Sequence, residues 1–169
     1  VLGANDGIIS ISALILGMAA ADATRSTLLT AGMAGLVAGA VSMALGEYVS
    51  VASQRDSEHS DIAKEAWELE HQADMELDEL TAIYQARGLS KDLARTVALE
   101  LTEHDALGAH LRDELGINKD ELARPLQAAG SSALAFLIGG TIPMLAAWWA
   151  SKTWRIGAIL AVTVVALIV

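Results

Sequence analysis

Two long stretches of the chain are free of charged residues. Neither residues 26–46 nor residues 126–151 contain an Asp, Glu, Lys or Arg. Each stretch reaches the ~20 residues that a helix needs to cross ~30 Å of hydrocarbon. The pattern therefore predicts a transmembrane helix in each. The second of them is expected to begin at Pro125, whose missing N–H costs little at a helix start, and to kink at Pro143.

A shorter apolar run precedes the first of these helices. Residues 7–21 extend only ~22 Å at ~1.5 Å per residue, too little to cross a membrane unless Asp6 and the residues before it also lie there. A polar turn at residues 22–26 then leads into a helix that stays apolar to about Ser53, except at Glu47. The two helices are expected to form an antiparallel hairpin. Two series of small residues with a four-residue spacing lie along the second helix, which favours close packing against protein: Ala31, Gly35 and Gly39, and then Ser42, Gly46 and Ser50.

The far end of the membrane region carries the signals of an interface. Trp148 and Trp149 end the third helix and Trp154 follows the turn that contains Lys152, an arrangement typical of an aromatic belt. The last apolar run, residues 156–169, stops before it could cross the membrane, so we expect the natural protein to continue. The start of the chain shows no signal-peptide pattern.

Almost all of the charge lies in the middle segment, residues 54–125. Three of the chain's 21 acids and three of its 11 bases lie outside it, so the segment holds 18 acids and 8 bases. This excess equals the net charge of −10 for the whole chain, and it should repel nucleic acid and attract cations. The pattern predicts soluble helices: one to about Ala86, a break at residues 87–89, a restart with Ser90 as N-cap, and a stop near Gly116.

These patterns predict an all-α fold. It would be a polytopic helical membrane protein with a three-helix soluble metal-binding domain, residues 54–125, inserted between membrane helices 2 and 3. Residues 1–53 would form helices 1 and 2, and residues 126–169 helix 3 and an incomplete helix 4. The basic residues of the soluble domain favour the cytoplasmic side. Because the chain has no cysteine, carboxylates, imidazoles and thioethers are its available metal ligands.

A stripe of carboxylates marks the first soluble helix. Two E-x-x-E pairs stand eleven residues apart, and at 100° per residue their members share an ~80° sector: Glu65, Glu68, Glu76 and Glu79. A single such pair is also compatible with a solvated helix face. Two pairs in phase favour a cation site, because like charges three residues apart destabilise a helix by a few tenths of a kcal/mol unless a cation compensates. The stripe spans ~21 Å, too long for one ion, so ligation requires it to face other ligands.

Such ligands follow Gly88. If the helix there runs through Gly108, five side chains share an ~120° sector: Glu100, Glu103, His104, His110 and Glu114. Carboxylate and imidazole ligands together suit Fe²⁺, Mn²⁺, Zn²⁺ or Co²⁺, whereas Ca²⁺ and Mg²⁺ prefer oxygen alone.

Two acids lie at membrane depth. Asp6 near the start of helix 1 and Glu47 near the end of helix 2 fall at the same level of an antiparallel hairpin, and Met43 adds a thioether one turn before Glu47. Because an acid in the membrane is costly, such residues commonly mark an ion or proton path. The alternative is that both acids reach up to the interface.

Five sequence blocks, in this order, resemble the vacuolar iron transporter family in its bacterial form: NDGIIS, GAVSMALGEYVSVASQ, the E-x-x-E repeats, IYQARGLS and RDELGI. The resemblance covers the whole chain. It implies a homodimer with five membrane helices per subunit, located in a bacterial inner membrane. This dimer would move Fe²⁺, or Mn²⁺, out of the cytoplasm in exchange for protons. Asp6, Met43 and Glu47 would line its pathway, and its soluble domain would capture the ion through Glu65, Glu68, Glu76, Glu79 and Glu114.

The chain departs from the plant pattern at four positions. Plant members carry methionines where this chain has His110 and Leu111, carry an acid in place of Gly35, and lack the acid that matches Glu47. A cation-binding ligand set remains, but the preference between Fe²⁺ and Mn²⁺ stays open. Two alternatives to a transporter also stay open: a membrane-anchored iron-binding or ferroxidase module, and an acidic domain that only solubilises a dimer interface.

Overall fold

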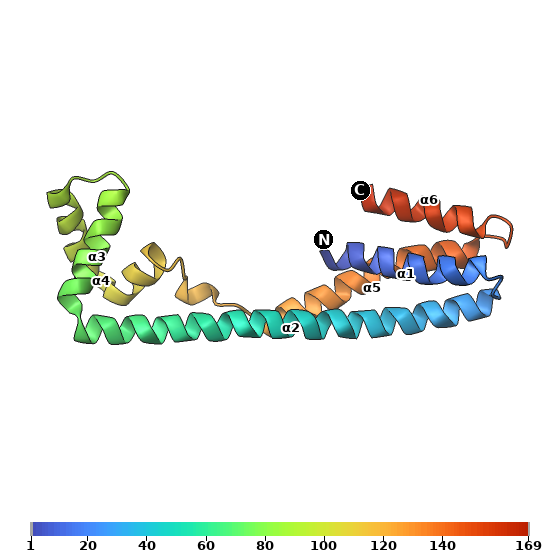
Figure 1. The fold of residues 1–169 in the computed structure, drawn as a ribbon, viewed down its shortest axis with the longest axis horizontal. Helices are drawn as coiled ribbons and strands as arrows, with labels where there is room; N and C mark the ends of the chain where they lie inside the picture. The colour runs from blue at the N-terminus through green and yellow to red at the C-terminus, as the bar shows by residue number, and fades with distance from the viewer. Residues whose placement is uncertain (1, 169) are drawn as a thin grey trace. The chain divides into compact units, whose positions relative to one another are not determined.

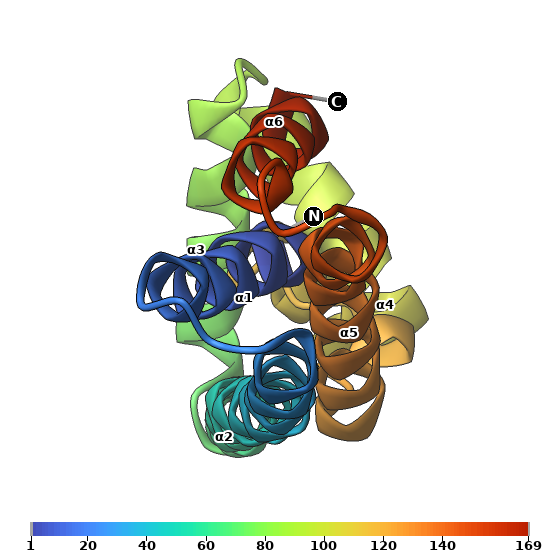
Figure 2. The same cartoon turned by 90° about the vertical axis from the view of Figure 1, so that its right-hand side faces the viewer.

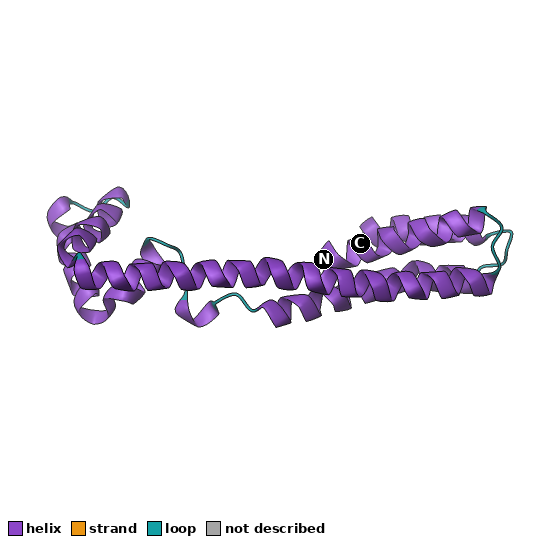
Figure 3. Cartoon of the chain, turned by 60° about the horizontal axis from the view of Figure 1, so that its bottom comes forward, coloured by secondary structure: helices purple, strands orange, loops and turns teal. Residues whose placement is uncertain are grey.

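A computed structural model describes residues 2–168, so Val1 and Val169, at the outer ends of the first and last predicted membrane segments, lie outside the described residues. It contains α1 (Leu2–Ala20), α2 (Arg25–His71), α3 (Ala73–Ala86), α4 (Lys91–Asp113), α5 (Pro125–Trp149), α6 (Arg155–Ile168) and a short 3-10 helix, η1 (Lys119–Glu121) (Figure 1). The described residues form no strand (Figure 3). The predicted all-α fold is therefore confirmed.

The chain divides into two compact units. One, here called the apolar unit, comprises residues 1–51 and 125–169, and the other, the acidic unit, comprises residues 52–124. Helix α2 contributes to both.

Three helices of the apolar unit are long and apolar enough to cross a membrane, namely α1, α2 and α5, whereas α6 is shorter. α1 begins before Asp6, so the acid lies within the helix that the short apolar run predicted. α5 begins at Pro125, as predicted, and continues through Pro143. The expected end of helix 2 near Ser53 is wrong, because α2 continues to His71 without a Gly or Pro beyond residue 46 to interrupt it.

The closest helix packing in the apolar unit joins α1 to α5 (Figure 2). A Cβ atom at Gly7 would collide with the carbonyl oxygen of Phe136, and one at Gly139 with the carbonyl oxygen of Ala4. These glycines therefore allow the two backbones to touch. The predicted small-residue face of α2 meets protein only in part: Gly39 packs on the Phe136 ring, whereas nothing lies within 4 Å of a Cβ at Gly46.

Substituting Gly139 with leucine is expected to destabilise the apolar unit by about 1–3 kcal/mol or more, because the side chain must push α1 away from α5. The matched control is Gly130→Ala on the same helix, where an added Cβ meets nothing within 4 Å. Thermal unfolding in detergent, followed by circular dichroism, measures both. Equal melting temperatures for Gly139→Leu and the wild type would contradict the tight α1–α5 contact.

Polar contacts join the two turns at one end of the apolar unit. The Lys152 ammonium lies 2.7 Å from an Asp22 carboxylate oxygen, and Arg25 donates a hydrogen bond to the Ala150 carbonyl at 2.9 Å. Trp149 and Trp154 are exposed at this end. The aromatic belt remains a prediction from the sequence.

Candidate metal centre

The carboxylate stripe is folded at Gln72. The prediction of one helix to about Ala86 is wrong here, because α2 ends at His71 and α3 starts at Ala73, with Gln72 at φ −135° and ψ 31°. His71 Nδ1 donates to the Trp67 carbonyl at 2.8 Å, and the two rings stack. Such a side-chain bond competes with the backbone ladder at the helix end. The break places the first E-x-x-E pair on α2 and the second on α3.

A turn at residues 87–90 then brings α4 back against α3. Gly88 supplies a positive φ of 103°, which other residues rarely adopt. The break at residues 87–89 and Ser90 at the N-cap position are confirmed, although the Ser90 side chain makes no capping hydrogen bond. Leu80, Ala98 and Ala109 form the buried contact between the helices, and the two small alanines allow them to approach.

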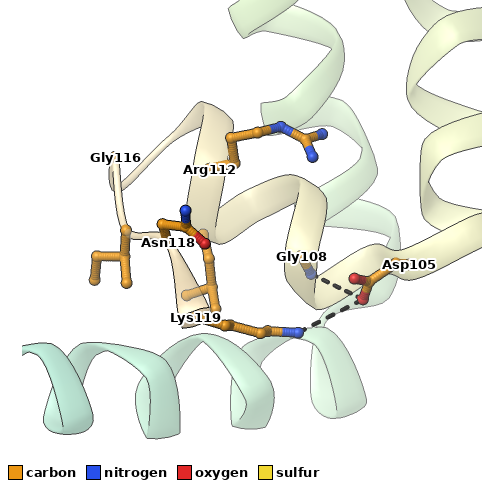
Figure 4. Close-up of a pocket in the computed structure, with 8 residues that line it drawn as sticks. Asp105, Gly108, Arg112, Gly116, Asn118 and Lys119 are labelled. Carbon is orange, nitrogen blue, oxygen red and sulfur yellow. Dashed lines mark hydrogen bonds and ion pairs between the residues drawn. The ribbon is translucent and has the colours of Figure 1, made fainter. Parts of the chain in front are cut away.

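α4 is interrupted at Asp105, which has φ −160° and ψ 84°. The Asp105 side chain accepts a hydrogen bond from the Gly108 N–H at 2.9 Å and so caps a new helical segment (Figure 4). The condition for the 120° sector is therefore not met. Glu103 and His104 precede the interruption, whereas His110 follows it. The spacing of Asp105 and Gly108 is a capping signal that the sequence analysis missed.

Four side chains converge where α2, α3 and α4 meet. One ligand atom from each of Glu65, Glu76, His110 and Glu114 lies within 4.8 Å of all the others. His110 Nδ1 is 2.9 Å from a Glu65 oxygen, 3.0 Å from a Glu114 oxygen and 3.6 Å from a Glu76 oxygen. All but Glu114 are buried. Opposite ligands of a cation with bonds of ~2.1 Å stand ~4.2 Å apart, so one ion fits this spacing.

The hydrogen bonds within this cluster are incomplete. One N–H on His110 Nδ1 faces three carboxylates, and it meets hydrogen-bond geometry with Glu114. Among the described residues, the buried Glu65 Oε1 and His110 Nε2 make no hydrogen bond. Glu65 Oε1 shares its one close partner, His110 Nδ1 at 2.9 Å, with two other acids, so the three buried or partly buried carboxylates lack matching positive charge and indicate a site for a cation.

Burial and mutual repulsion disturb the protonation of the cluster. Burial, with the charge of Glu114 as the next cause, raises the pKa of Glu65 from 4.5 to about 7. Burial also raises the pKa of Glu76. Carboxylates that are buried and close together hold protons at a higher pH than usual. They release these protons when a divalent ion binds, because the ion compensates the negative charge of the ionised groups. The arrangement thus suits exchange of protons for a metal.

Of the nine candidate metal ligands named from the sequence, the structure brings four together. Glu68 and Glu79 are the neighbours of the cluster: both act through their charge on Glu76, and Glu68 also pairs with Lys64 at 3.0 Å. Glu100, Glu103 and His104 are exposed and do not belong to the cluster.

The predicted membrane residues all lie in the apolar unit. Asp6 is exposed on α1 and accepts a 3.4 Å hydrogen bond from Ser10. Met43 packs against the apolar core, and Glu47 is half-buried on α2. Within residues 2–168 no hydrogen bond or ion pair joins Asp6 to Glu47.

The chain is similar in sequence to known proteins over its whole length. The profile of the VIT family matches residues 1–169. The chain is 46% identical over 168 residues to the Vacuolar iron transporter of Acanthamoeba castellanii, an alignment that covers 99% of this chain and 61% of that protein. It is 35% identical over 147 residues to Vacuolar iron transporter 2 of Oryza sativa subsp. japonica, an alignment that covers 86% of this chain and 60% of that protein. It is 34% identical over 169 residues to Vacuolar iron transporter homolog 3 of Arabidopsis thaliana, covering 99% and 61%. The chain therefore spans about 60% of the length of these relatives.

Proposed function

Because the chain belongs to the VIT family, we propose that it transports Fe²⁺ across a membrane and that the acidic unit captures the ion first. One observation carries the capture step: one ligand atom from each of three carboxylates and one imidazole lies within 4.8 Å of the others, and the buried Glu65 Oε1 has an ion-pair contact with His110 Nδ1 at 2.9 Å but no hydrogen bond. The relatives named above are vacuolar iron transporters, which supports Fe²⁺ as the transported ion.

In this proposal, Glu65, Glu76, His110 and Glu114 bind the ion, and Glu68 and Glu79 attract it by charge. A mixed nitrogen and oxygen ligand set favours Fe²⁺, Mn²⁺, Zn²⁺ or Co²⁺ over Ca²⁺ and Mg²⁺. Mn²⁺ is therefore a second expected substrate. The segment of residues 54–125 carries the whole net charge of −10. Its remaining acids raise the local cation concentration.

The apolar unit would carry the translocation step. Asp6, Met43 and Glu47 offer hard and soft ligands on the two helices that the sequence predicts to line a pathway. We further propose that the protein is a homodimer, that the acidic unit faces the cytoplasm, and that protons move in exchange for the metal. Location in a bacterial inner membrane remains a prediction from the sequence resemblance, whereas the relatives compared above are named as vacuolar transporters.

Replacing Asp6 or Glu47 with alanine is expected to lower Fe²⁺ flux into proteoliposomes more than about tenfold, because a dehydrated ion loses a charged ligand. Fluorescence quenching of a trapped metal-sensitive dye measures the flux. The control is Ser10→Ala, which removes the hydrogen bond to Asp6 and leaves its carboxylate in place. Unchanged flux in both acid variants would show that the pathway is elsewhere. Oxygen consumption on adding Fe²⁺ to the wild type, without flux, would support the ferroxidase alternative.

A further inference from the structure

Two sequence blocks of the acidic unit meet in space through residues that the metal site does not use. Tyr84 and Arg87 belong to IYQARGLS at the end of α3, and Asp113 belongs to RDELGI at the end of α4. Tyr84 Oη donates to one Asp113 carboxylate oxygen at 2.8 Å, and Arg87 Nη1 donates to the other at 2.6 Å. Arg87 Nη2 also donates to the Asp113 backbone carbonyl at 3.1 Å. We call these three residues the clasp.

The clasp lies directly beside two ligands of the metal site. Asp113 precedes Glu114 in the chain, and His110 lies one turn before Glu114, whose N–H donates to the His110 carbonyl at 2.9 Å. The Asp113 side chain is only 9% exposed, and both of its carboxylate oxygens accept hydrogen bonds from α3. Both carboxylate oxygens of Asp113 are therefore used in the clasp, and Asp113 is not one of the four clustered ligands.

The helical segment that carries His110 is thus held at both ends by an aspartate. Asp105 caps its start through the Gly108 N–H and lies 3.6 Å from the Lys119 ammonium (Figure 4). Asp113 fastens its end to α3. Between them the segment turns the buried His110 toward the carboxylates of Glu65 and Glu76.

We propose that Asp113 is a positioning residue of the metal site, which sets the geometry of Glu114 and His110 through its bonds to Tyr84 and Arg87. The last turn of a helix frays when nothing holds it. Without the clasp, Glu114, the most exposed of the four ligands and the one at the C-cap of α4, would leave the ion. This inference rests on the proposed capture function of the acidic unit.

Titration of the whole chain in detergent with Co²⁺ tests the proposal, because the visible absorption of bound Co²⁺ reports its ligands and symmetry. Asp113→Ala is expected to weaken Co²⁺ binding between about 10- and 100-fold, the usual effect of losing a group that orients a ligand. Its absorption spectrum should shift toward that of Glu114→Ala. Asp113→Asn should recover most of the affinity and the wild-type spectrum, because the amide oxygen still accepts one of the two hydrogen bonds.

The matched control is Asp78→Ala. Asp78 also joins α3 to α4, through an ion pair with Arg95 at 2.7 Å, but it is 73% exposed and contacts no ligand. Its removal takes away the same charge and a similar link between the helices. Affinity and spectrum should stay at wild-type values in this variant. Equal losses in Asp78→Ala and Asp113→Ala would overturn the positioning role in favour of a general effect of charge or helix contact.

Wild-type affinity and an unshifted spectrum in Asp113→Ala would overturn the inference while leaving the metal site intact. Absence of Co²⁺ binding by the wild type would instead overturn the capture function itself. If Asp113→Ala does not fold, Tyr84→Phe decides, because it removes one bond of the clasp and keeps the ring in the α3–α4 core. A smaller loss of affinity with the same direction of spectral shift supports the proposal, and wild-type behaviour refutes it.

Discussion

Replacing Glu65 with glutamine is expected to weaken Fe²⁺ and Mn²⁺ binding by more than about 100-fold, or about 2.7 kcal/mol. Its carboxylate is the closest of the three to His110 and has an oxygen without a hydrogen bond. The amide keeps the shape of the side chain but supplies a neutral, weaker ligand to the ion. Anaerobic calorimetry on the whole chain measures the change.

The control for charge is Glu70→Gln, which changes an exposed acid five residues further along α2. Its affinity should remain within about twofold of the wild type, since surface charges are screened by salt. Equal binding by Glu65→Gln and the wild type would mean that the cluster is a repulsive feature of the fold and that the metal binds elsewhere.

Without metal, the acidic unit is expected to become less stable as the pH rises from 4.5 to about 7. Unfolded Glu65 ionises at its ordinary pKa of 4.5, whereas in the folded protein burial raises that pKa to about 7. Between these values the folded state holds more protons, so the contribution of Glu65 to stability falls with rising pH by up to about 3 kcal/mol, and no further above pH 7. The stabilisation by bound metal has the opposite pH dependence and increases as the pH rises, because metal binding requires the ionised carboxylate.

Melting temperatures at pH 5.5 and pH 8, with and without Mn²⁺, test this sign. The wild type should melt lower at pH 8 than at pH 5.5 when metal-free, and Mn²⁺ should raise its melting temperature much more at pH 8. Glu65→Gln should lose most of the pH dependence of the metal-free form. An equal effect of Mn²⁺ at the two pH values would contradict the exchange of protons for metal.

Much of the architecture was predictable from the sequence, because the bilayer imposes a strong pattern on a chain. Runs without charge marked the membrane helices, and Gly88 marked the turn between α3 and α4. The resemblance to the vacuolar iron transporter family is confirmed by the match over the whole chain. The pairing of α1 with α5 was not predicted, since spaced glycines show that a close partner exists without showing which helix it is.

The candidate site was predictable as a set of residue types, but its geometry was not. All four clustered residues were among the predicted ligands, yet helical periodicity also included Glu103 and His104. Two helix breaks, at Gln72 and Asp105, determine which of the predicted ligands come together. Neither break coincides with a Gly or Pro. They depend on side-chain hydrogen bonds that compete with the helix backbone, and such local competition leaves little trace in the apolar pattern.

The position of the bound ion tests the central claim most directly. Crystals of the chain grown with Fe²⁺ under anaerobic conditions and measured at the iron absorption edge would locate the metal by its anomalous scattering. We expect a peak within bonding distance of Glu65, Glu76, His110 and Glu114. Iron found only at other positions, with this cluster showing no anomalous peak, would contradict capture by the acidic unit.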